Sequence, residues 1–539
     1  MSIIVPGVST ARKTPGINFN VVLGGPGTSA GAATKSIMLL GNHFTSAITG
    51  ASPSFSCAGG SAAAASVNFV ASEADAITLF GQGSELHRMC KAAFAQYPDA
   101  TVYACPVADA AGPAAGGVLT FATTASAAFT VRLKLCDLVI DVPVASGDTA
   151  TVIAAAVADA INDNADLPFT AQNSSGAITI TAKQTGPRGN VLVVDAYFVA
   201  AGSTIETRIT TSSTTSPGAS TTGQFSSTGT IGSEITLTSG ATQDNFANAL
   251  AAIEPVRYDH IVGACIESTN ADRIVTHINS NAGPTVQLLE QAVMASVDTY
   301  ANAVTLATGC NASRMQIVWH HASTLPAPEV AAQVAAARLA GDAFVGGVSP
   351  GEASDPAANL DGVNLASVHI QRVAADRPTA TEIEGALNNG LTVLAQSSVR
   401  PGHCAIVRSV TSRSLASGVP NYAVIDTAFV TVCDYVADTC RANLASQLVA
   451  AKLGADGADG NPASRAPNVT TPSIIRSMLY SCLKQMEADG ILRDVDANAS
   501  LLVVEADGTT AGRVNCEIPS EPVSALHQVA GNVRQLASL

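Results

Sequence analysis

The strongest candidate for catalytic chemistry is the segment GVSPG at residues 347–351, which matches the G-x-S-x-G pattern of a nucleophile elbow. In that motif the serine, here Ser349, lies between a strand and a helix, and the next backbone N–H helps to form the oxyanion hole. Pro350 follows the serine and has no N–H, and the segment after it, EASDPAAN, has no helical pattern. The sequence therefore favours a Gly/Pro turn over a hydrolase site.

Two further motifs could support nucleophilic chemistry or phosphate binding, but each is incomplete. Ser481 and Lys484 form an S-x-x-K pair, yet no S-D-N or K-T-G segment accompanies them. The glycines of GGPGTSAG, residues 24–31, have neither the G-K-[ST] nor the G-x-G-x-x-G spacing that phosphate binding requires. We therefore expect neither an enzyme nor a bound cofactor.

Possible metal ligands are equally isolated in the sequence. His320 and His321 are adjacent, but no third ligand lies near them, so they are interpreted as a polar pair at the end of a strand. Asp456 belongs to the segment GADGADGN, which resembles part of a calcium loop but lacks the glutamate that would complete the ligand set. No metal site is expected.

The chain has eleven cysteines without a C-x-x-C pair or a histidine at zinc-ligand spacing. Buried free thiols are the simplest interpretation for a protein made in a reducing compartment. Bridges between neighbouring subunits are the alternative, with Cys57 and Cys440 as candidates.

The elements that would position these residues alternate between helix and strand. A helical pattern runs from Ser84 to Pro98 and is followed by the strand-like TVYACPV. The same alternation returns with the helix DNFANALAAIEP, the strands DHIVGACI and RMQIVWHH, and the helix VAAQVAAARLAG. Between these two parts, residues 113–243 contain β-branched runs and a Ser/Thr/Gly tract, which predicts an inserted β-rich module.

The remaining segments predict a strand and two helices in the C-terminal region, and further regular structure near both chain ends. CAIVRSVTS is expected to form a strand, residues 424–452 a long helix, and Pro472 opens a second helix whose apolar stripe would pack in a core. RVNCEIP is predicted as a strand, whereas later apolar residues from Leu526 to Leu536 have helical spacing. Near the start, Ile17, Phe19 and Val21 alternate with polar residues, as in a strand with one apolar face.

Composition limits the classes of partner. Hydrophobic residues make up 47% of the 539 residues, charged residues 13% and aromatic residues 4%, and the net charge is -15. This length predicts several domains.

The absence of a basic cluster argues against nucleic-acid binding, and no apolar run is long enough to span a membrane. No secretory signal is recognisable, so assembly in the cytoplasm is expected, and low surface charge suits a protein that is covered by copies of itself.

Several segments, in this order, resemble the tail sheath proteins of Mu-like contractile phages. They are INFNVVLGGPGTSAGAATKSIMLLG, GQGSELHRMCKAAFAQYPDATVYACPVAD, the insert segment that ends in TAKQTGPRGNVLVV, YDHIVGACIES, VTTPSIIRSMLYSCLKQMEADGILRDVD and GRVNCEIPSEPVSALHQVAGNVRQLASL. The resemblance runs nearly end to end, and its weight comes from the order of the segments. LDGVNLASVHIQRV departs from the segment that the family would have there.

The resemblance implies a multi-domain α/β (α+β) fold, with a sheath core built from both chain ends, a β-rich insert and extended terminal arms. The assembly arms would include Ile17, Phe19, Val21, Val22 and Leu23 at the start and Val514 and Ile518 near the end. The expected domains are an N-terminal arm 1–35, core α/β parts 36–112 and 244–362, an inserted outer domain 113–243, a C-terminal sheath domain 363–512, and a terminal strand and arm 513–539.

The same resemblance implies a structural function in the virion tail. The subunit would polymerise helically, in hexameric rings, around the tail tube protein, contact baseplate and neck or terminator proteins, and contract to drive the tube through the host envelope. Strands donated to neighbouring sheets would link the polymer. Two alternatives stay open: the sheath of a phage-tail-like bacteriocin or secretion device, and a Ser/Thr-rich surface or adhesin protein, which would need an export signal.

Overall fold

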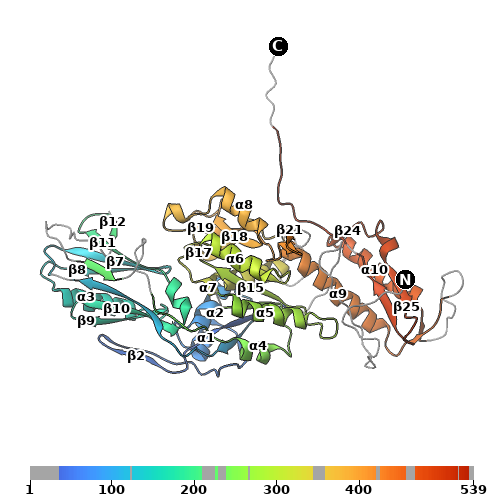
Figure 1. Ribbon diagram of the computed structural model, residues 1–539, viewed down its shortest axis with the longest axis horizontal. Helices are drawn as coiled ribbons and strands as arrows, with labels where there is room; N and C mark the ends of the chain where they lie inside the picture. Colours follow the sequence, from blue (N-terminus) through green and yellow to red (C-terminus); the bar gives the residue numbers. More distant parts are fainter. Residues whose placement is uncertain are drawn as a thin grey trace, which may run out of the picture.

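The computed structural model describes residues 35–121, 124–204, 206–208, 225–228, 238–264, 267–343, 359–420, 425–456, 468–519 and 521–532. Three bodies follow one another along the longest axis of the molecule: a β-rich body, a central α/β body and a smaller helical body near the C-terminus (Figure 1). No helix among the described residues is long and apolar enough to cross a bilayer.

The central body is built on a nine-stranded sheet in the order β17-β19-β18-β16-β15-β14-β1-β5-β4. Its strands are β1 Ile37–Asn42, β4 Asn68–Val70, β5 Val102–Val107, β14 His260–Gly263, β15 Gln291–Ser296, β16 Met315–Trp319, β17 Asn364–His369, β18 Leu391–Gln396 and β19 His403–Arg408. The central strands from β5 to β18 pair in parallel, and β4, β17 and β19 pair antiparallel at the edges. β1 is buried along its whole length, as expected for a parallel strand covered on both faces.

Helices cover both faces of this sheet: α1 Glu73–Phe80, α2 Glu85–Gln96, α4 Ala247–Ile253, α5 Ser268–Asn281, α6 Tyr300–Cys310, α7 Ala327–Ala343 and α8 Ala380–Asn388. Ser84 begins α2 by accepting a hydrogen bond from the N–H of His87. In α7 every residue from 327 to 339 is buried, between the sheet and α2. Its many alanines allow this close approach, because they place little side-chain volume between the layers.

The β-rich body consists of two four-stranded sheets, β13-β6-β10-β9 and β12-β11-β7-β8. Its elements are β6 Ala114–Phe121, β7 Phe129–Leu135, β8 Leu138–Val144, α3 Ala150–Asn162, β9 Phe169–Ser174, β10 Ala177–Thr185, the 3-10 helix η1 Pro187–Val191, β11 Val194–Ala200, β12 Glu206–Arg208 and β13 Phe225–Thr228. β6 and β7 alternate between buried and half-buried residues, so one face of each sheet packs inward. The hairpin β2 Ile48–Ala51 and β3 Ser54–Cys57 reaches this body through Asn173 N–H, which donates to Ser52 O at 2.7 Å.

The third body contains α9 Thr427–Gln447 and α10 Pro472–Ala488 with short strand pairs. Its strands are β22 Lys452–Leu453, β23 Val469–Thr470, β24 Leu492–Arg493, β25 Val503–Ala506, β26 Val514–Glu517 and β27 Glu521–Pro522, with the 3-10 helix η3 Ala499–Leu501. The hairpin of β20 Leu415–Ala416 and β21 Val419–Pro420 lies at the end of α6 instead, where the Leu415 N–H donates to Asn311 Oδ1 at 3.0 Å, and the 3-10 helix η2 Ala374–Asp376 precedes α8. The buried side chains of α9 and α10 form one apolar core.

The strand predicted within RVNCEIP is confirmed as β26, and the helix that opens at Pro472 is confirmed as α10. The helix predicted over 424–452 is shorter, since α9 ends at Gln447 and residues 452–453 form β22. The helical spacing after Leu526 left the conformation of the tail open, and residues 526–532 form no helix in the structure. Ser349 and residues 1–34 lie outside the described part of the chain.

Candidate assembly surface and its supporting joints

The clearest candidate for an assembly surface is the small sheet of β25 and β26. The strands pair antiparallel from Val503 opposite Glu517 to Ala506 opposite Val514, and no described strand pairs with either outer edge. One face packs on the core of the C-terminal body through Val504, Val514 and Cys516. Among the described residues, the two strands thus have outer edges that no strand covers, as at the edge of a sheet.

The predicted arm residues divide into two groups in the structure. Val514 begins β26 and Ile518 follows it, and both pack against the core of α9 and α10 in the same subunit. They thus support the β25–β26 sheet within the subunit, and a role in contacts between subunits remains a prediction. Residues 17–23, which include Ile17, Phe19, Val21, Val22 and Leu23, lie outside the described residues.

The C-terminal tail after β27 runs away from the body without regular structure as far as it is described (Figure 1). Leu526 is 74% exposed and Val529 82% exposed. His527 attaches this segment to the central body: its Nδ1 lies 2.5 Å from Asp361 Oδ2, and its Nε2 lies 3.4 Å from Asp426 Oδ2. The tail thus carries exposed apolar side chains and is attached at a point next to them.

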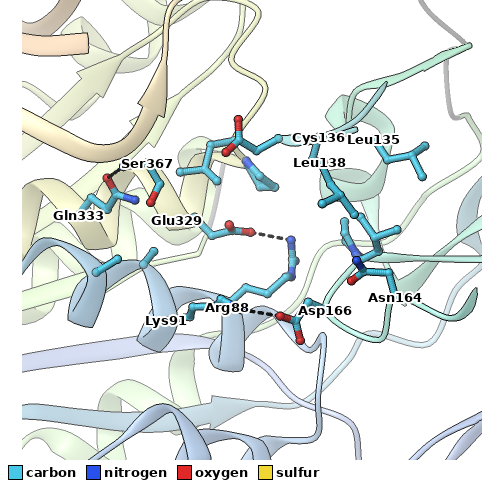
Figure 2. A pocket seen from close by; sticks show the side chains of 17 residues that line it. Arg88, Lys91, Leu135, Cys136, Leu138, Asn164, Asp166, Glu329, Gln333 and Ser367 are labelled. Atoms are coloured by element: carbon cyan, nitrogen blue, oxygen red, sulfur yellow. Dashed lines mark hydrogen bonds and ion pairs between the residues drawn. The ribbon is translucent and has the colours of Figure 1, made fainter. Parts of the chain in front are cut away.

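A cavity of about 310 Å³ separates the β-rich body from the central body (Figure 2). Its walls come from α2, the start of α7, the turn between β7 and β8, and the segment after α3. In it, Arg88 Nη1 donates to Glu329 Oε1 at 2.6 Å, and both side chains are nearly buried. Arg88 Nε and Gln333 Nε2 have no hydrogen-bond partner among the described residues. This cavity, with an ion pair in it, indicates a less tightly packed interface than the apolar cores on either side.

Arg188 joins the β-rich body to the central sheet from the other side of this interface. It lies in η1, within the TGPRGN turn, and its guanidinium donates to Asn42 Oδ1, Ala264 O and Asp244 Oδ2, with Glu85 Oε2 at 3.1 Å. Asn42 and Ala264 stand at the carboxyl ends of β1 and β14. Open α/β sheets bind ligands beyond the carboxyl ends of their strands. Here Arg188 itself occupies that position, which makes it a structural joint.

Carboxylates outnumber the guanidinium group at this joint. Glu85, Asp109 and Asp244 surround Arg188, and Asn42 Nδ2 donates to Asp109. Desolvation, the charge of Asp244 and the charge of Glu85 raise the pKa of Asp109 to about 6. Burial likewise raises the pKa of Glu85. The joint therefore gains negative charge as the pH rises through 6.

We expect the Arg188 joint to contribute less to the stability of the protein as the pH rises from about 4 to 7, and Asp109→Asn to remove this part of the pH dependence. The folded state retains a proton on Asp109 that the unfolded state has already released, so ionisation at higher pH costs folding free energy. Because the side chain is partly solvent-exposed, screening reduces the effect to about 1 kcal/mol. Urea unfolding at pH 5 and pH 8 measures it. An equal pH dependence in both proteins would contradict the assignment.

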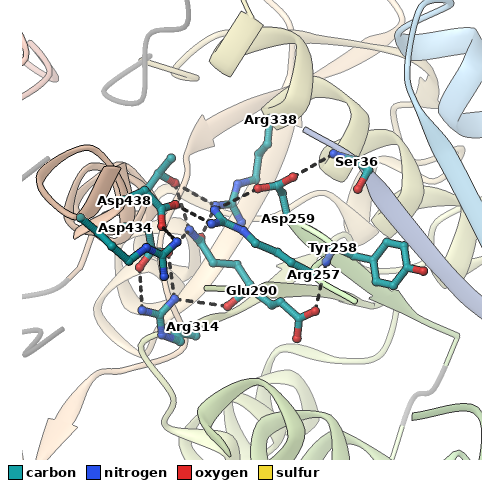
Figure 3. Close-up of polar contacts among 12 residues, drawn as sticks. Ser36, Arg257, Tyr258, Asp259, Glu290, Arg314, Arg338, Asp434 and Asp438 are labelled. Atoms are coloured by element: carbon teal, nitrogen blue, oxygen red, sulfur yellow. Dashed lines mark hydrogen bonds and ion pairs between the residues drawn. The ribbon is translucent and has the colours of Figure 1, made fainter. Parts of the chain in front are cut away.

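A second joint fixes α9 to the amino-terminal edge of the central sheet (Figure 3). Arg314, just before β16, donates to both carboxylate oxygens of Asp434 at 2.8 and 2.6 Å, and both side chains are about 5% exposed or less. One turn further along α9, Asp438 accepts from Arg257 at 2.5 Å. Gln291 Nε2 also donates to Asp434, at 3.4 Å. Paired, hydrogen-bonded charges of this kind hold two bodies in one orientation, and separating the partners is costly.

The remaining motifs have structural partners and no converging ligands. His320 follows β16, is buried, and has Cys404 Sγ 3.3 Å from its Nε2; burial lowers its pKa to about 4. Lys484 pairs with Glu487 and Asp496, and Asp456 accepts from Ser473 at the start of α10. No group of three or more His, Cys, Asp or Glu residues in the described ranges could hold a metal ion.

Both cysteines proposed for bridges between subunits are buried. Cys57 ends β3, and Cys440 lies in the core between α9 and α10. Whether either one bridges to another subunit remains a prediction.

Comparison with known proteins gives the identity of the C-terminal part directly. Residues 426–535 match the phage tail sheath C-terminal domain family. These residues include α9, α10 and the β25–β26 sheet, together with most of the C-terminal tail. The family match therefore falls on the part of the chain that contains the candidate assembly surface.

A relative matches over most of the remaining length. The Mu-like prophage FluMu tail sheath protein of Haemophilus influenzae is 24% identical over 458 residues, which cover 85% of this chain and 86% of that protein. Among solved structures, the sheath tail protein of Desulfitobacterium hafniense covers 92% of this chain and 94% of its own, with 13% identity and a TM-score of 0.47. The sheath tail protein of Listeria innocua has the same two coverages, 14% identity and a TM-score of 0.45. Residues 426–535 thus match the phage tail sheath C-terminal domain family, and over most of its length the chain is similar to a Mu-like prophage tail sheath protein.

Proposed function

We propose that this protein polymerises into a helical sheath around a tail tube and contracts to drive the tube through a host envelope. The single observation that carries the proposal is the β25–β26 sheet, which lies on a well-packed support and pairs with no other described strand. An isolated two-stranded sheet is only marginally stable, and a third strand would complete it. A strand from a second copy of the chain supplies that partner.

Strand addition explains why such a contact would give a long polymer. The donor surface, residues 17–23, differs from the acceptor surface at β25 and β26, so the contact is heterologous. Heterologous contacts propagate from copy to copy and form an open helix when the rotation does not close a ring. The exposed tail around Leu526 and Val529 is a second donor candidate, since its apolar side chains face solvent in the single chain.

The two joints would transmit force during contraction. Arg188 couples the β-rich body to the carboxyl edge of the central sheet, and Asp434 couples α9 to the amino edge. A conformational change driven by the lattice needs stiff subunits, because flexible ones would absorb the motion. In this proposal the energy comes from the difference between two lattice packings, and no nucleotide is consumed.

The expected domain plan remains part of the proposal. Residues 1–35 would form the N-terminal arm, residues 36–112 and 244–362 the core, and residues 113–243 the outward insert. Residues 363–512 would form the C-terminal sheath domain, and residues 513–539 the terminal strand and arm. Hexameric rings, contacts with the tail tube protein and with baseplate and neck or terminator proteins, and assembly in the host cytoplasm complete the proposal. In it the subunit is structural and not catalytic.

Negative-stain electron microscopy of the purified full chain tests the proposal. Hollow, striated tubes would support it. Monodisperse globules under all salt and concentration conditions would contradict it.

His527 is expected to influence assembly through the direction of the tail. Replacing it by alanine removes the contacts with Asp361 and Asp426, so the tail should leave the body without a fixed orientation. If each contact between subunits loses about 1.4 kcal/mol of binding free energy, the critical concentration for assembly rises about tenfold. Sedimentation of assembled protein measures the critical concentration. His321→Ala, which removes another histidine contact at Asp298 O, is the control, and an unchanged value for His527→Ala would refute the role.

A further inference from the structure

Three cysteines of the C-terminal body lie in or against one small core. Cys440 lies on α9, Cys482 on α10 and Cys516 on β26. The Cys440 side chain is fully buried, and Cys482 is 8% exposed. The core consists of residues from α9, α10 and the segments that follow them, and Cys516 packs against it.

The helix positions of Cys440 and Cys482 direct both thiols into the space between α9 and α10. Cys440 is one turn from the buried residues Val436 and Leu444 on α9. Cys482 lies on the buried stripe of α10 that includes Leu479 and Met486. Residues spaced in this way share one helix face, so the two stripes meet in the common core.

Both thiols lie in this core, and a hydrogen bond between them raises the pKa of Cys440 and lowers the pKa of Cys482. We propose that Cys440 and Cys482 form an intramolecular disulfide that joins α9 to α10 when the protein meets an oxidising environment. Cys516, on the neighbouring strand, is close enough to Cys440 to interact with it electrostatically. It is the competing partner that the experiment must exclude.

The surroundings of the two thiols indicate which one reacts first with the oxidant. The hydrogen bond from Cys440 lowers the pKa of Cys482, and Cys482 is also the more exposed of the two. Its thiolate attacks a small-molecule disulfide, which forms a mixed disulfide and releases one thiol of the oxidant. Cys440, after losing its proton, attacks the Cys482 sulfur and releases the second thiol. The pair loses two protons and two electrons in total, and the oxidant is reduced to two thiols.

The bridge would connect the α9 joint to the assembly surface. α9 carries Asp434 and Asp438, which bind the central body, while α10 contacts the β25 strand. This mechanical consequence rests on the proposed sheath function, whereas the bridge itself does not. A covalent link that closes a loop of roughly forty residues restricts the unfolded chain and stabilises the folded C-terminal body.

The test uses the full-length protein, incubated with oxidised or with reduced glutathione, blocked with an alkylating reagent and analysed as unreduced peptides by mass spectrometry. We expect a Cys440–Cys482 linked pair, lighter by two hydrogen atoms, in most molecules after oxidation. The thermal transition of the C-terminal body should rise by about 5 °C. Cys440→Ser and Cys482→Ser should each abolish both changes, whereas Cys105→Ser, which alters a buried thiol of the central body, should retain them.

Three outcomes would overturn the proposal: alkylation of both thiols after unfolding of the oxidised protein, a bridge from Cys516 to either partner, or a bridge between two subunits. The linked peptide pair is measured in the wild-type protein, so this result holds even if a cysteine variant fails to fold. Tube formation is scored in the same samples. Tubes without the bridge overturn only the disulfide, and the bridge without tubes overturns only the sheath function.

Discussion

Removing residues 1–24 is expected to leave a folded protein that no longer forms tubes. The described bodies begin at residue 35, and the described core residues alone fill three apolar cores, so we expect the deletion not to change the thermal transition measurably. The proposed donor strand, residues 17–23, would be lost with all of its main-chain hydrogen bonds to the neighbouring sheet. Sedimentation and negative-stain microscopy should then show subunits or short oligomers in place of long tubes.

The alternation of the donor strand provides a matched control. Phe19→Asp places a charge on the apolar face that would cover the neighbour's sheet, and it should raise the critical concentration for assembly by a factor of ten or more. Asn18→Asp or Asn20→Asp introduces the same charge on the opposite face and should change assembly little. Tubes of normal length from the truncated chain, or equal effects of the substitutions on the two faces, would contradict strand donation by this segment.

Replacing Asp434 by alanine is expected to destabilise the protein by about 3–5 kcal/mol. The change leaves the buried Arg314 guanidinium without the carboxylate that accepts two of its hydrogen bonds, at 2.8 and 2.6 Å. Gln291 loses a partner in the same place. Chemical denaturation followed by circular dichroism should show an earlier transition of the C-terminal body, because α9 is no longer fixed to the central sheet.

An exposed pair with the same geometry is the control for this prediction. Arg132 binds both oxygens of Asp141, each at 2.7 Å, but the Asp141 side chain is 46% exposed. Asp141→Ala should therefore cost less than about 1 kcal/mol. If Asp434→Ala and Asp141→Ala had similar effects, burial of the Arg314–Asp434 pair would not determine the strength of this joint.

The sequence predicted those helices and strands whose caps and apolar spacing lie within one short segment. The helix expected from Ser84 is confirmed as α2, with Ser84 as its N-cap, and the helix expected from Pro472 is confirmed as α10. Both helices have buried stripes at helical spacing. The same spacing around Leu526 left the conformation of the tail open, and in the structure Leu526 and Val529 are exposed and belong to no helix. Apolar spacing thus predicts a helix only where a core is available to cover it.

The joints could not be predicted from local patterns. Arg314 and Asp434 are 120 positions apart, and Arg188 meets Asn42 across 146 positions. A single arginine in a turn and a single aspartate on a helix give no signal of their pairing. The contact of His527 with Asp361 could not be predicted either, because the two residues are far apart in the sequence. The Pro-Arg-Gly-Asn turn around Arg188 was recognised as part of the family resemblance, but its role as a joint is visible only in the structure.

The central claim is that one copy of the chain completes the β25–β26 sheet of another, and the backbone of an assembled tube tests it most directly. Electron cryomicroscopy of tubes grown from the purified full chain, at a resolution that traces strands, would show the environment of β25 and β26. We predict at least one additional strand from a different copy, hydrogen-bonded to an outer edge of this sheet. Tubes in which β25 and β26 remain a two-stranded sheet would contradict the account.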